Sequence, residues 1–309
     1  MKNKLLLIVK ILISGGIIYY LFKQISFQNL LHTYSNINLL ILIIAIMILF
    51  LQSSLRSLKW KYILASDNIY VPYLFLLKSI LIGGFISLFL PTSFGGDVYR
   101  VYALKKYNLD ALQNASSVLF DRICGLFALT SISIISYTFF YKHIIDYRFL
   151  GIYLFGIILF LIFSSERVLA FLDNIKFKIL SFFLSIFKSF NKYRSRKNTF
   201  LKSLVISFVI QNNIIWLIKL YCVALNISID IRYLYMVVPL IYLTETLPIS
   251  INGLGVREGA FVFFFFQAGY TKEEALAVAL LVVAMRYLFS MIIGGSLFFK
   301  AMLLPDKKK

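Results

Sequence analysis

The sequence predicts an all-α polytopic membrane protein with about seven to nine membrane segments. Hydrophobic residues make up 61% of the 309 residues and charged residues 15%, whereas a soluble domain is roughly half apolar and about a quarter charged. The 31 Phe and 20 Tyr give the aromatic excess typical of lipid-facing and interfacial surfaces. Long apolar runs recur along the whole chain. These observations exclude a soluble enzyme, a secreted disulfide scaffold and a disordered chain.

Crossing the hydrocarbon core takes about 20 mostly apolar residues. The candidate runs are 5–22, 39–55, 74–90, 116–140, 149–163, 201–225, 233–247 and 275–299. A further run, 259–268, is too short to cross alone. Lys2 and Lys4 precede the first run as in a signal peptide, but Lys10 interrupts it and no small-residue cleavage site follows. We therefore expect a retained first helix.

The charge balance favours a membrane as the partner. The chain has 32 basic and 13 acidic residues, a net charge of +19. Basic loops beside a membrane indicate orientation and contact with anionic headgroups, and no nucleic-acid-binding motif is present. We expect a single integral membrane domain over 1–309, with a first half (1–163), a basic cytoplasmic linker (164–199) and a second half (200–309). Mixed apolar and cationic residues in 168–190 favour a helix lying in the interface, and the alternative is a solvated linker.

Two apolar runs break at proline in a similar way. Residues 90–100 read LPTSFGGDVYR and residues 247–257 read LPISINGLGVR, so Leu, Pro, Ser, Gly and Arg recur at identical spacing. Proline stops a helix and glycine permits irregular backbone, which a membrane tolerates only inside protein or beside a watery cavity. Paired broken segments in two halves indicate the midplane site of a transporter.

We therefore expect an inverted repeat of two re-entrant hairpins, and the alternative is a pair of ordinary interfacial loops. The predicted tips are Pro91, Ser93, Gly95 and Gly96 in the first motif and Pro248, Ser250, Gly253 and Gly255 in the second. With the N-terminus inside, hairpins that enter and leave on one face put most basic loop residues, including the linker and the tail, on the inner side. This satisfies the positive-inside rule and predicts a cell-membrane protein with both termini cytoplasmic.

Several charged residues lie within or beside the apolar runs. An intramembrane charge costs at least ~2.5 kcal/mol on insertion scales, so it usually has a partner or a function. Arginine matches phosphate geometry bidentately, which predicts a lipid-phosphate pocket. The pocket would contain Arg100, Arg122, Arg257 and Arg286, with the charge partners Asp97, Asp121, Glu245 and Glu258. The alternative is a set of buried ion pairs that hold the hairpins in place.

Catalysis has little support in the sequence. His32 and His143 have no metal-ligand spacing, and the chain has no nucleotide-binding glycine loop, zinc motif or nucleophile elbow. We expect no catalytic residue, no metal and no cofactor.

The same residues carry a family resemblance. Residues 90–97 with Arg100, then Asp121-Arg122-x-x-Gly125, then 247–258, resemble the membrane region of lysylphosphatidylglycerol synthase/flippases, the flippase-like integral membrane family. The resemblance covers essentially the whole chain, with Asp121 standing where the family pattern has Glu. Bifunctional members add a cytoplasmic domain that transfers lysine, and a chain ending at Lys309 is expected to lack it.

The resemblance implies a flippase-like protein that translocates or binds an anionic phospholipid or lipid-linked glycan. Two alternatives stay open: a membrane-embedded enzyme that modifies lipid headgroups, and a non-transporting partner subunit of a glycolipid or cell-envelope pathway. A second copy of the chain and an envelope-pathway protein are the candidate protein partners.

Overall fold

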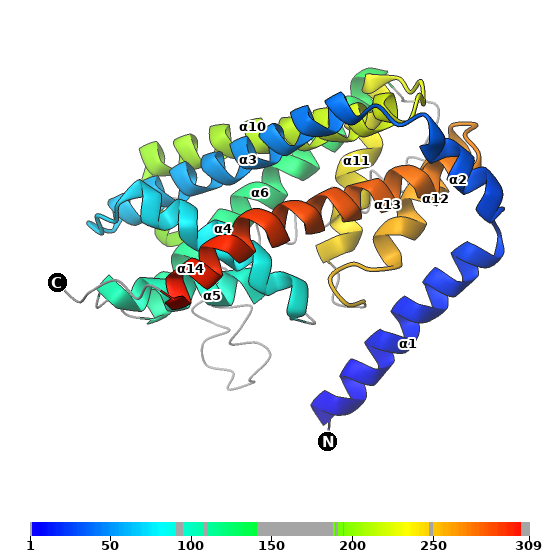
Figure 1. Ribbon diagram of the computed structural model, residues 1–309. Helices are drawn as coiled ribbons and strands as arrows, with labels where there is room; N and C mark the ends of the chain where they lie inside the picture. The colour runs from blue at the N-terminus through cyan, green and yellow to red at the C-terminus, as the bar shows by residue number, and fades with distance from the viewer. Residues whose placement is uncertain are drawn as a thin grey trace. The chain divides into compact units, whose positions relative to one another are not determined.

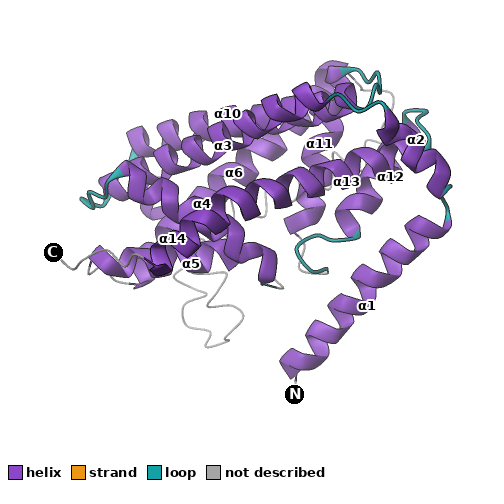
Figure 2. Cartoon of the chain, viewed as in Figure 1, coloured by secondary structure: helices purple, strands orange, loops and turns teal. Residues whose placement is uncertain are grey.

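The computed structural model describes residues 2–90, 95–107, 111–140, 188, 191–193, 195–246 and 250–303. Within these residues every regular element is a helix, which confirms the predicted all-α class (Figure 2). The helices are α1 (Lys2–Lys23), α2 (Phe27–Ser35), α3 (Leu39–Ser66), α4 (Tyr73–Phe89), α5 (Gly95–Ala103), the 3₁₀ helix η1 (Leu104–Tyr107), α6 (Ala111–Phe140), α10 (Lys197–Ala224), α11 (Ile231–Thr246), α12 (Val256–Gln267), α13 (Lys272–Phe289), the π-helix η2 (Ser290–Gly295) and α14 (Ser296–Leu303).

Four of these helical stretches are long and apolar enough to cross a membrane. They are Leu39–Ser66, Gln113–Phe139, Lys197–Ala224 and Lys272–Leu303, and the shorter apolar helix Tyr73–Phe89 joins them. The chain is therefore a multi-pass helical membrane protein. The total of seven to nine segments stays a prediction, because the run 149–163 and most of the linker lie outside the described residues.

Two helices differ from the sequence-based expectation. α3 continues well past the predicted run 39–55, through a basic stretch, because Trp60, Ile63 and Leu64 turn a second apolar face inward and are fully buried. α2 occupies a segment expected to be a loop. Its Ser26 N-cap accepts a hydrogen bond from the Asn29 backbone amide, which satisfies one of the unpaired donors of the first turn.

The chain divides into two compact units. Unit 1 contains Met1–Ser53, Lys78–Tyr99 and Asn212–Lys309, and unit 2 contains Ser54–Leu77 and Arg100–Gln211. Each unit takes segments from both predicted halves of the chain. The division into two halves and a linker stays a prediction.

In unit 1, α12 packs against α11, α13 and α1, and α2 packs against α13 (Figure 1). The Tyr34 hydroxyl donates to the Ala277 carbonyl of α13 at 2.7 Å. The Tyr233 hydroxyl at the start of α11 donates to the Phe264 carbonyl near the end of α12 at 2.6 Å. Because opposite ends of α11 and α12 meet, these two helices form an antiparallel hairpin around the second Pro/Gly motif.

In unit 2, aromatic and aliphatic side chains from α3, α6 and the start of α10 form the core. The ring centres of Phe120 and Tyr193 lie 4.6 Å apart, and Ile63, Ile123 and Cys124 complete the buried cluster. This cluster holds residues just before α10 against α3 and α6.

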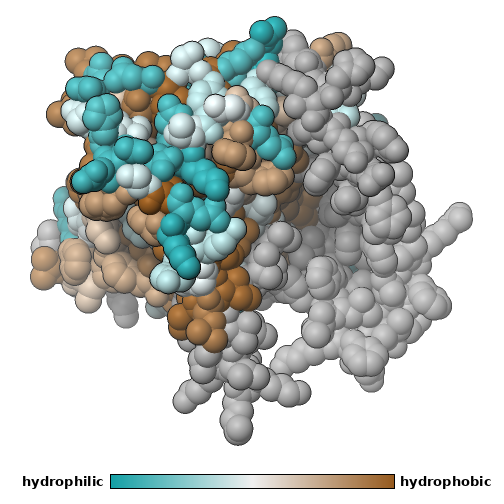
Figure 3. Space-filling view, turned by 90° about the vertical axis from the view of Figure 1, so that its right-hand side faces the viewer, coloured by the Kyte–Doolittle hydropathy of each residue, from teal (hydrophilic) through white to brown (hydrophobic). Residues whose placement is uncertain are grey.

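Much of the apolar surface is exposed, as a lipid-facing protein requires. In the most apolar stretch of α3, only 11% of the residues are buried inside the protein. This helix nevertheless has the joint highest mean hydropathy of the four candidate spans. Exposed apolar area of that extent would promote aggregation in water but fits a hydrocarbon environment. On one face, Figure 3 shows hydrophilic residues gathered at the upper left, with hydrophobic residues beside and below them.

Glycines allow segments of unit 1 to approach α4 closely. A Cβ on Gly96 would lie 2.7 Å from the Gly83 carbonyl oxygen, so α5 starts directly against α4 and the chain turns back around the first motif. A Cβ on Gly294 in η2 would lie 2.4 Å from the Leu81 carbonyl oxygen. Backbone-to-backbone packing of this kind leaves no space for a side chain.

Replacing Gly294 with Ala is therefore expected to lower the free energy of unfolding by about 1–3 kcal/mol, because α4 and η2 must separate. Thermal unfolding of the detergent-purified protein measures the change. Gly16→Ala is the matched control, because a Cβ at Gly16 meets nothing within 4 Å and α1 gains up to about 1 kcal/mol of helix propensity. A Gly294→Ala protein as stable as wild type would contradict the close contact.

Candidate functional site

The second Pro/Gly motif forms an irregular loop at the start of α12. Gly253 and Gly255 have φ angles of +77° and +83°, which L side chains rarely adopt. A Cβ on Gly253 would lie 2.7 Å from Cγ of Glu245, and one on Gly255 would lie 3.0 Å from the Ser14 carbonyl oxygen. The two glycines thus allow α11 to approach the loop on one side and α1 on the other.

Arg257, in the first turn of α12, is almost completely buried, with its side chain 2% exposed. Its Nη2 and Nε lie 2.8 Å and 3.2 Å from Glu258 Oε1. The other oxygen of Glu258 accepts a hydrogen bond from the Gly255 backbone amide at 2.6 Å. Glu258 therefore holds the arginine and satisfies an otherwise unpaired donor at the N-terminus of the helix.

Glu245, near the end of α11, connects Arg257 to a second arginine. Its Oε2 lies 3.5 Å from Arg257 Nη1, and its Oε1 accepts from Arg286 Nη1 at 2.5 Å. The side chain of Glu245 is 12% exposed and that of Arg286, on α13, is 40% exposed. We call Glu245, Arg257, Glu258 and Arg286 the Glu245 cluster. Its two carboxylates balance its two guanidinium groups.

The loop is also bonded to the helix that leads into the first motif. The Asn252 side-chain amide donates to the Ser87 and Leu90 carbonyls at 3.0 Å and 2.9 Å, and the Ile251 amide donates to Ser14 Oγ at 3.2 Å. The last carbonyls of a helix have no donor within the helix, so Asn252 satisfies two such acceptors at the end of α4. The second Pro/Gly motif is therefore bonded to the end of α4, where the first motif begins.

A second buried charge cluster lies in unit 2. Asp121 on α6 forms ion pairs with Lys59 Nζ at 2.6 Å and Arg100 Nη1 at 2.9 Å. Lys59 also donates to Ser207 Oγ at 3.0 Å, and the Arg100 guanidinium lies 4.3 Å from the centre of the Trp60 ring. Asp121 thereby joins α3, α5, α6 and α10.

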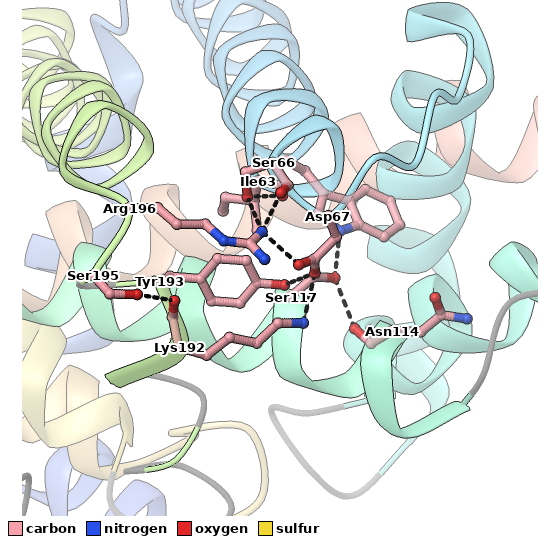
Figure 4. A network of polar contacts seen from close by, with 10 residues as sticks. Ile63, Ser66, Asp67, Asn114, Ser117, Lys192, Tyr193, Ser195 and Arg196 are labelled. Carbon is pink, nitrogen blue, oxygen red and sulfur yellow. Dashed lines mark hydrogen bonds and ion pairs between the residues drawn. The ribbon is translucent and has the colours of Figure 1, made fainter. Parts of the chain in front are cut away.

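A third polar cluster joins the end of α3 to the residues that precede α10 (Figure 4). Asp67 accepts from Lys192 Nζ at 2.8 Å, from Arg196 Nη1 at 2.6 Å and from the Tyr193 hydroxyl. Arg196 also donates to Ser66 Oγ at 3.1 Å. The Asp67 side chain is buried, whereas about a third of each of the Lys192 and Arg196 side chains is exposed.

Asp67 lies outside the membrane-spanning helices, one residue past the span Leu39–Ser66. Burial alone would raise the pKa of its carboxyl group, but the hydrogen bonds from Lys192, Tyr193 and Arg196 and the positive charge of Lys192 outweigh burial and lower that pKa. Burial and the hydrogen bond to Asp67 raise the pKa of the Tyr193 hydroxyl, which therefore stays protonated and donates.

The sequence-predicted charges fall into two groups. Arg257, Arg286, Glu245 and Glu258 come together in unit 1, and Arg100 with Asp121 forms the cluster in unit 2. Arg122 is half-buried on α6, and Asp97 is half-buried in the first turn of α5. The expectation that all four arginines share one lipid-phosphate pocket stays a prediction.

The predicted hairpin tips are described in part. Gly95, Gly96, Ser250, Gly253 and Gly255 are in the described residues, and Ser250 is buried. Pro91, Ser93 and Pro248 lie outside the described residues.

Sequence reasoning missed three residues that the clusters depend on: Lys59, Asp67 and Asn252. Lys59 follows the predicted run 39–55 and was expected at an inner membrane surface. Asp67 is an isolated acid in a basic region of the chain, which is the one available signal for its role. Among the described residues, no three His, Cys, Asp or Glu side chains come close enough together to hold a metal ion.

Comparison with known families places the chain. The family described as the lysylphosphatidylglycerol synthase TM region matches residues 7–294, and the protein belongs to this family, as its motifs predicted. Membership makes it a multi-pass membrane protein linked to lipid metabolism. No curated protein and no solved structure matches the chain.

Asp67→Asn is expected to destabilise the protein at neutral pH by about 1.5–3 kcal/mol, because hydrogen bonds to a charged acceptor are lost. The loss is limited because Lys192 and Arg196 are partly exposed and water can solvate their charges. A carboxyl group whose pKa is lowered by folding stabilises at pH values above its unfolded pKa and loses that contribution as the pH falls through its folded pKa. The difference in melting temperature between wild type and Asp67→Asn should therefore shrink in acid. Asp230→Asn removes an exposed pair with Arg232 and is the control. An equal difference at neutral and acid pH would contradict the role of the Asp67 charge.

Proposed function

We propose that the protein binds the phosphate of an anionic lipid or lipid-linked glycan and translocates it across the cytoplasmic membrane, without altering it chemically. The observation that carries this proposal is Glu245, a nearly buried carboxylate shared by two arginines, of which Arg286 is partly exposed. A guanidinium group presents paired donors that match two phosphate oxygens. A phosphate that reaches Arg286 would compete with Glu245 for the same donors.

Arg286 is better suited to bind the phosphate than Arg257. Arg257 is buried and is held by two contacts to Glu258, so moving it would break the start of α12. When Arg286 turns away, Glu245 keeps Arg257 as a partner through its other oxygen. Every buried carboxylate then still has an opposite charge beside it. A buried carboxylate without such a partner would strongly destabilise the protein. Arg257 therefore maintains the site and Arg286 engages the lipid.

We further propose that both motifs are tips of re-entrant hairpins in an inverted repeat of about seven to nine membrane segments with both termini cytoplasmic. α12 has 12 residues. At ~1.5 Å per residue it spans about 18 Å, short of the ~30 Å hydrocarbon core. The 9 residues of α5 are shorter still. Asn252, which bonds the second loop to the end of α4, supports a common position for the two tips.

Lipid scrambling in proteoliposomes tests this proposal, with fluorescent phosphatidylglycerol and a polyprenyl-phosphate probe. Arg286→Gln is expected to reduce transport about 10- to 100-fold, the equivalent of ~1.5–3 kcal/mol for charge-assisted hydrogen bonds. Arg232→Gln, at an exposed arginine, should transport as wild type does. Arg257→Gln should mainly unfold the protein, because it leaves the buried carboxylate of Glu258 without its cationic partner.

Three results would contradict the proposal. Wild-type vesicles that match empty vesicles for every anionic lipid would favour a non-transporting partner subunit. A chemically changed headgroup would favour an enzyme. Transport by Arg286→Gln at the wild-type rate would show that Arg286 does not bind the lipid phosphate during transport.

A further inference from the structure

Glu245 has a geometry that links anion binding to a second ion. Its two oxygens contact different arginines on different helices, at 2.5 Å from Arg286 on α13 and 3.5 Å from Arg257 on α12. The carboxylate can therefore lose one partner and keep the other. We propose that binding of a lipid phosphate at Arg286 is coupled to uptake of one proton by Glu245, so that the protein moves a lipid anion and a proton together. This inference rests on the proposed function and adds its energy coupling.

The charge balance of the cluster requires a compensating ion. The empty cluster has two guanidinium groups and two carboxylates, so its net charge is zero. A phosphodiester bound at Arg286 adds one negative charge beside Glu245 and Arg257, whose side chains are 12% and 2% exposed. An uncompensated charge in such a place is costly, and a buried acid neutralises rather than remaining ionised without a partner. One proton restores the net charge to zero.

Glu245 is the carboxylate that loses a partner when Arg286 binds the phosphate. Glu258 keeps both of its contacts to Arg257 and its hydrogen bond from Gly255, and its side chain is only 4% exposed. Protonating Glu258 would weaken these contacts, which hold the start of α12. Glu245 is the more exposed of the two acids and gives up its 2.5 Å contact to Arg286. The proton is therefore taken up by Glu245.

Among the described residues, few other charged or titratable groups lie around Glu245. Arg257 and Glu258 lie on α12, Arg286 lies on α13, and Tyr242 on α11 interacts with Arg257. α1 and α4 contribute Ser14 and the Ser87 carbonyl to the adjoining loop, and neither of these titrates near neutral pH. The transfer is balanced: one O–H bond forms on Glu245 as one O–H bond of a hydronium ion or a buffer acid breaks, while Arg286 and the phosphodiester keep their charges.

The test measures equilibrium binding of short-chain phosphatidylglycerol to the full-length protein in detergent between about pH 5 and about pH 8, where a phosphodiester does not titrate. Wild-type affinity should fall by up to about tenfold per pH unit at the alkaline end, the slope for uptake of one proton. Glu245→Gln mimics the protonated acid, so its affinity should be independent of pH and equal to the acid limit of wild type. Glu273→Gln makes the same chemical change in the first turn of α13, where Glu273 accepts from the Ser26 amide, and should keep the wild-type slope.

A second measurement does not depend on whether Glu245→Gln folds. In weakly buffered solution at the alkaline end of the range, wild-type protein should take up about one proton per lipid bound, reported by a pH-sensitive dye. Lipid binding with no pH dependence and no proton uptake would overturn the coupling and leave the proposed function intact. A pH slope that persists in Glu245→Gln would also overturn it. No binding at any pH would overturn the proposed function and the coupling together.

Discussion

A buried charge inside a membrane protein must have an opposite charge beside it, and in unit 1 this constraint centres on Glu245. The carboxylate lies between arginines from α12 and α13, and the loop can approach it at Gly253 because glycine has no Cβ. The loop that carries Gly253 is in turn bonded to α1 and to the end of α4. Five helices of unit 1 therefore meet around one ionic contact.

The two Pro/Gly motifs are alike in sequence but differ in their ion pairs. Arg100 and Arg257 occupy equivalent positions, ten residues after the leucine of each motif. Arg257 is held by a carboxylate next to it in the chain, whereas Arg100 depends on Asp121 from a later helix and lies over the Trp60 ring. The first arginine thus joins separate helices of unit 2, and the second stabilises the start of its own helix. The repeated motif therefore determines the position of the arginine in the sequence, whereas the packing of the surrounding helices determines which acidic residue pairs with it.

This difference explains how much the sequence could predict. Apolar runs predicted the helical class and most helix positions, because burial in lipid selects residue type directly. The charged residues of the clusters were also recognisable, since a charge in an apolar run is costly. Their pairing was not, because Glu245 and Arg286 are 41 residues apart and only packing brings them together. Lys59 and Asp67 were missed because each lies beyond the predicted run 39–55, where a solvated position is equally compatible with the sequence.

Under the proposed function, the neutral state of the Glu245 cluster also bears on the direction in which the lipid would move. A site that carries a lipid anion alone works with or against the membrane potential, at about 2.3 kcal/mol per charge for each 100 mV. A site that carries the anion with a proton moves no net charge, so the potential does no work on the loaded form. The pH difference and the lipid gradient alone then set the direction. In the proposed coupling, Glu245 exchanges one arginine partner for a proton, and this exchange alone would link the lipid anion to the pH difference.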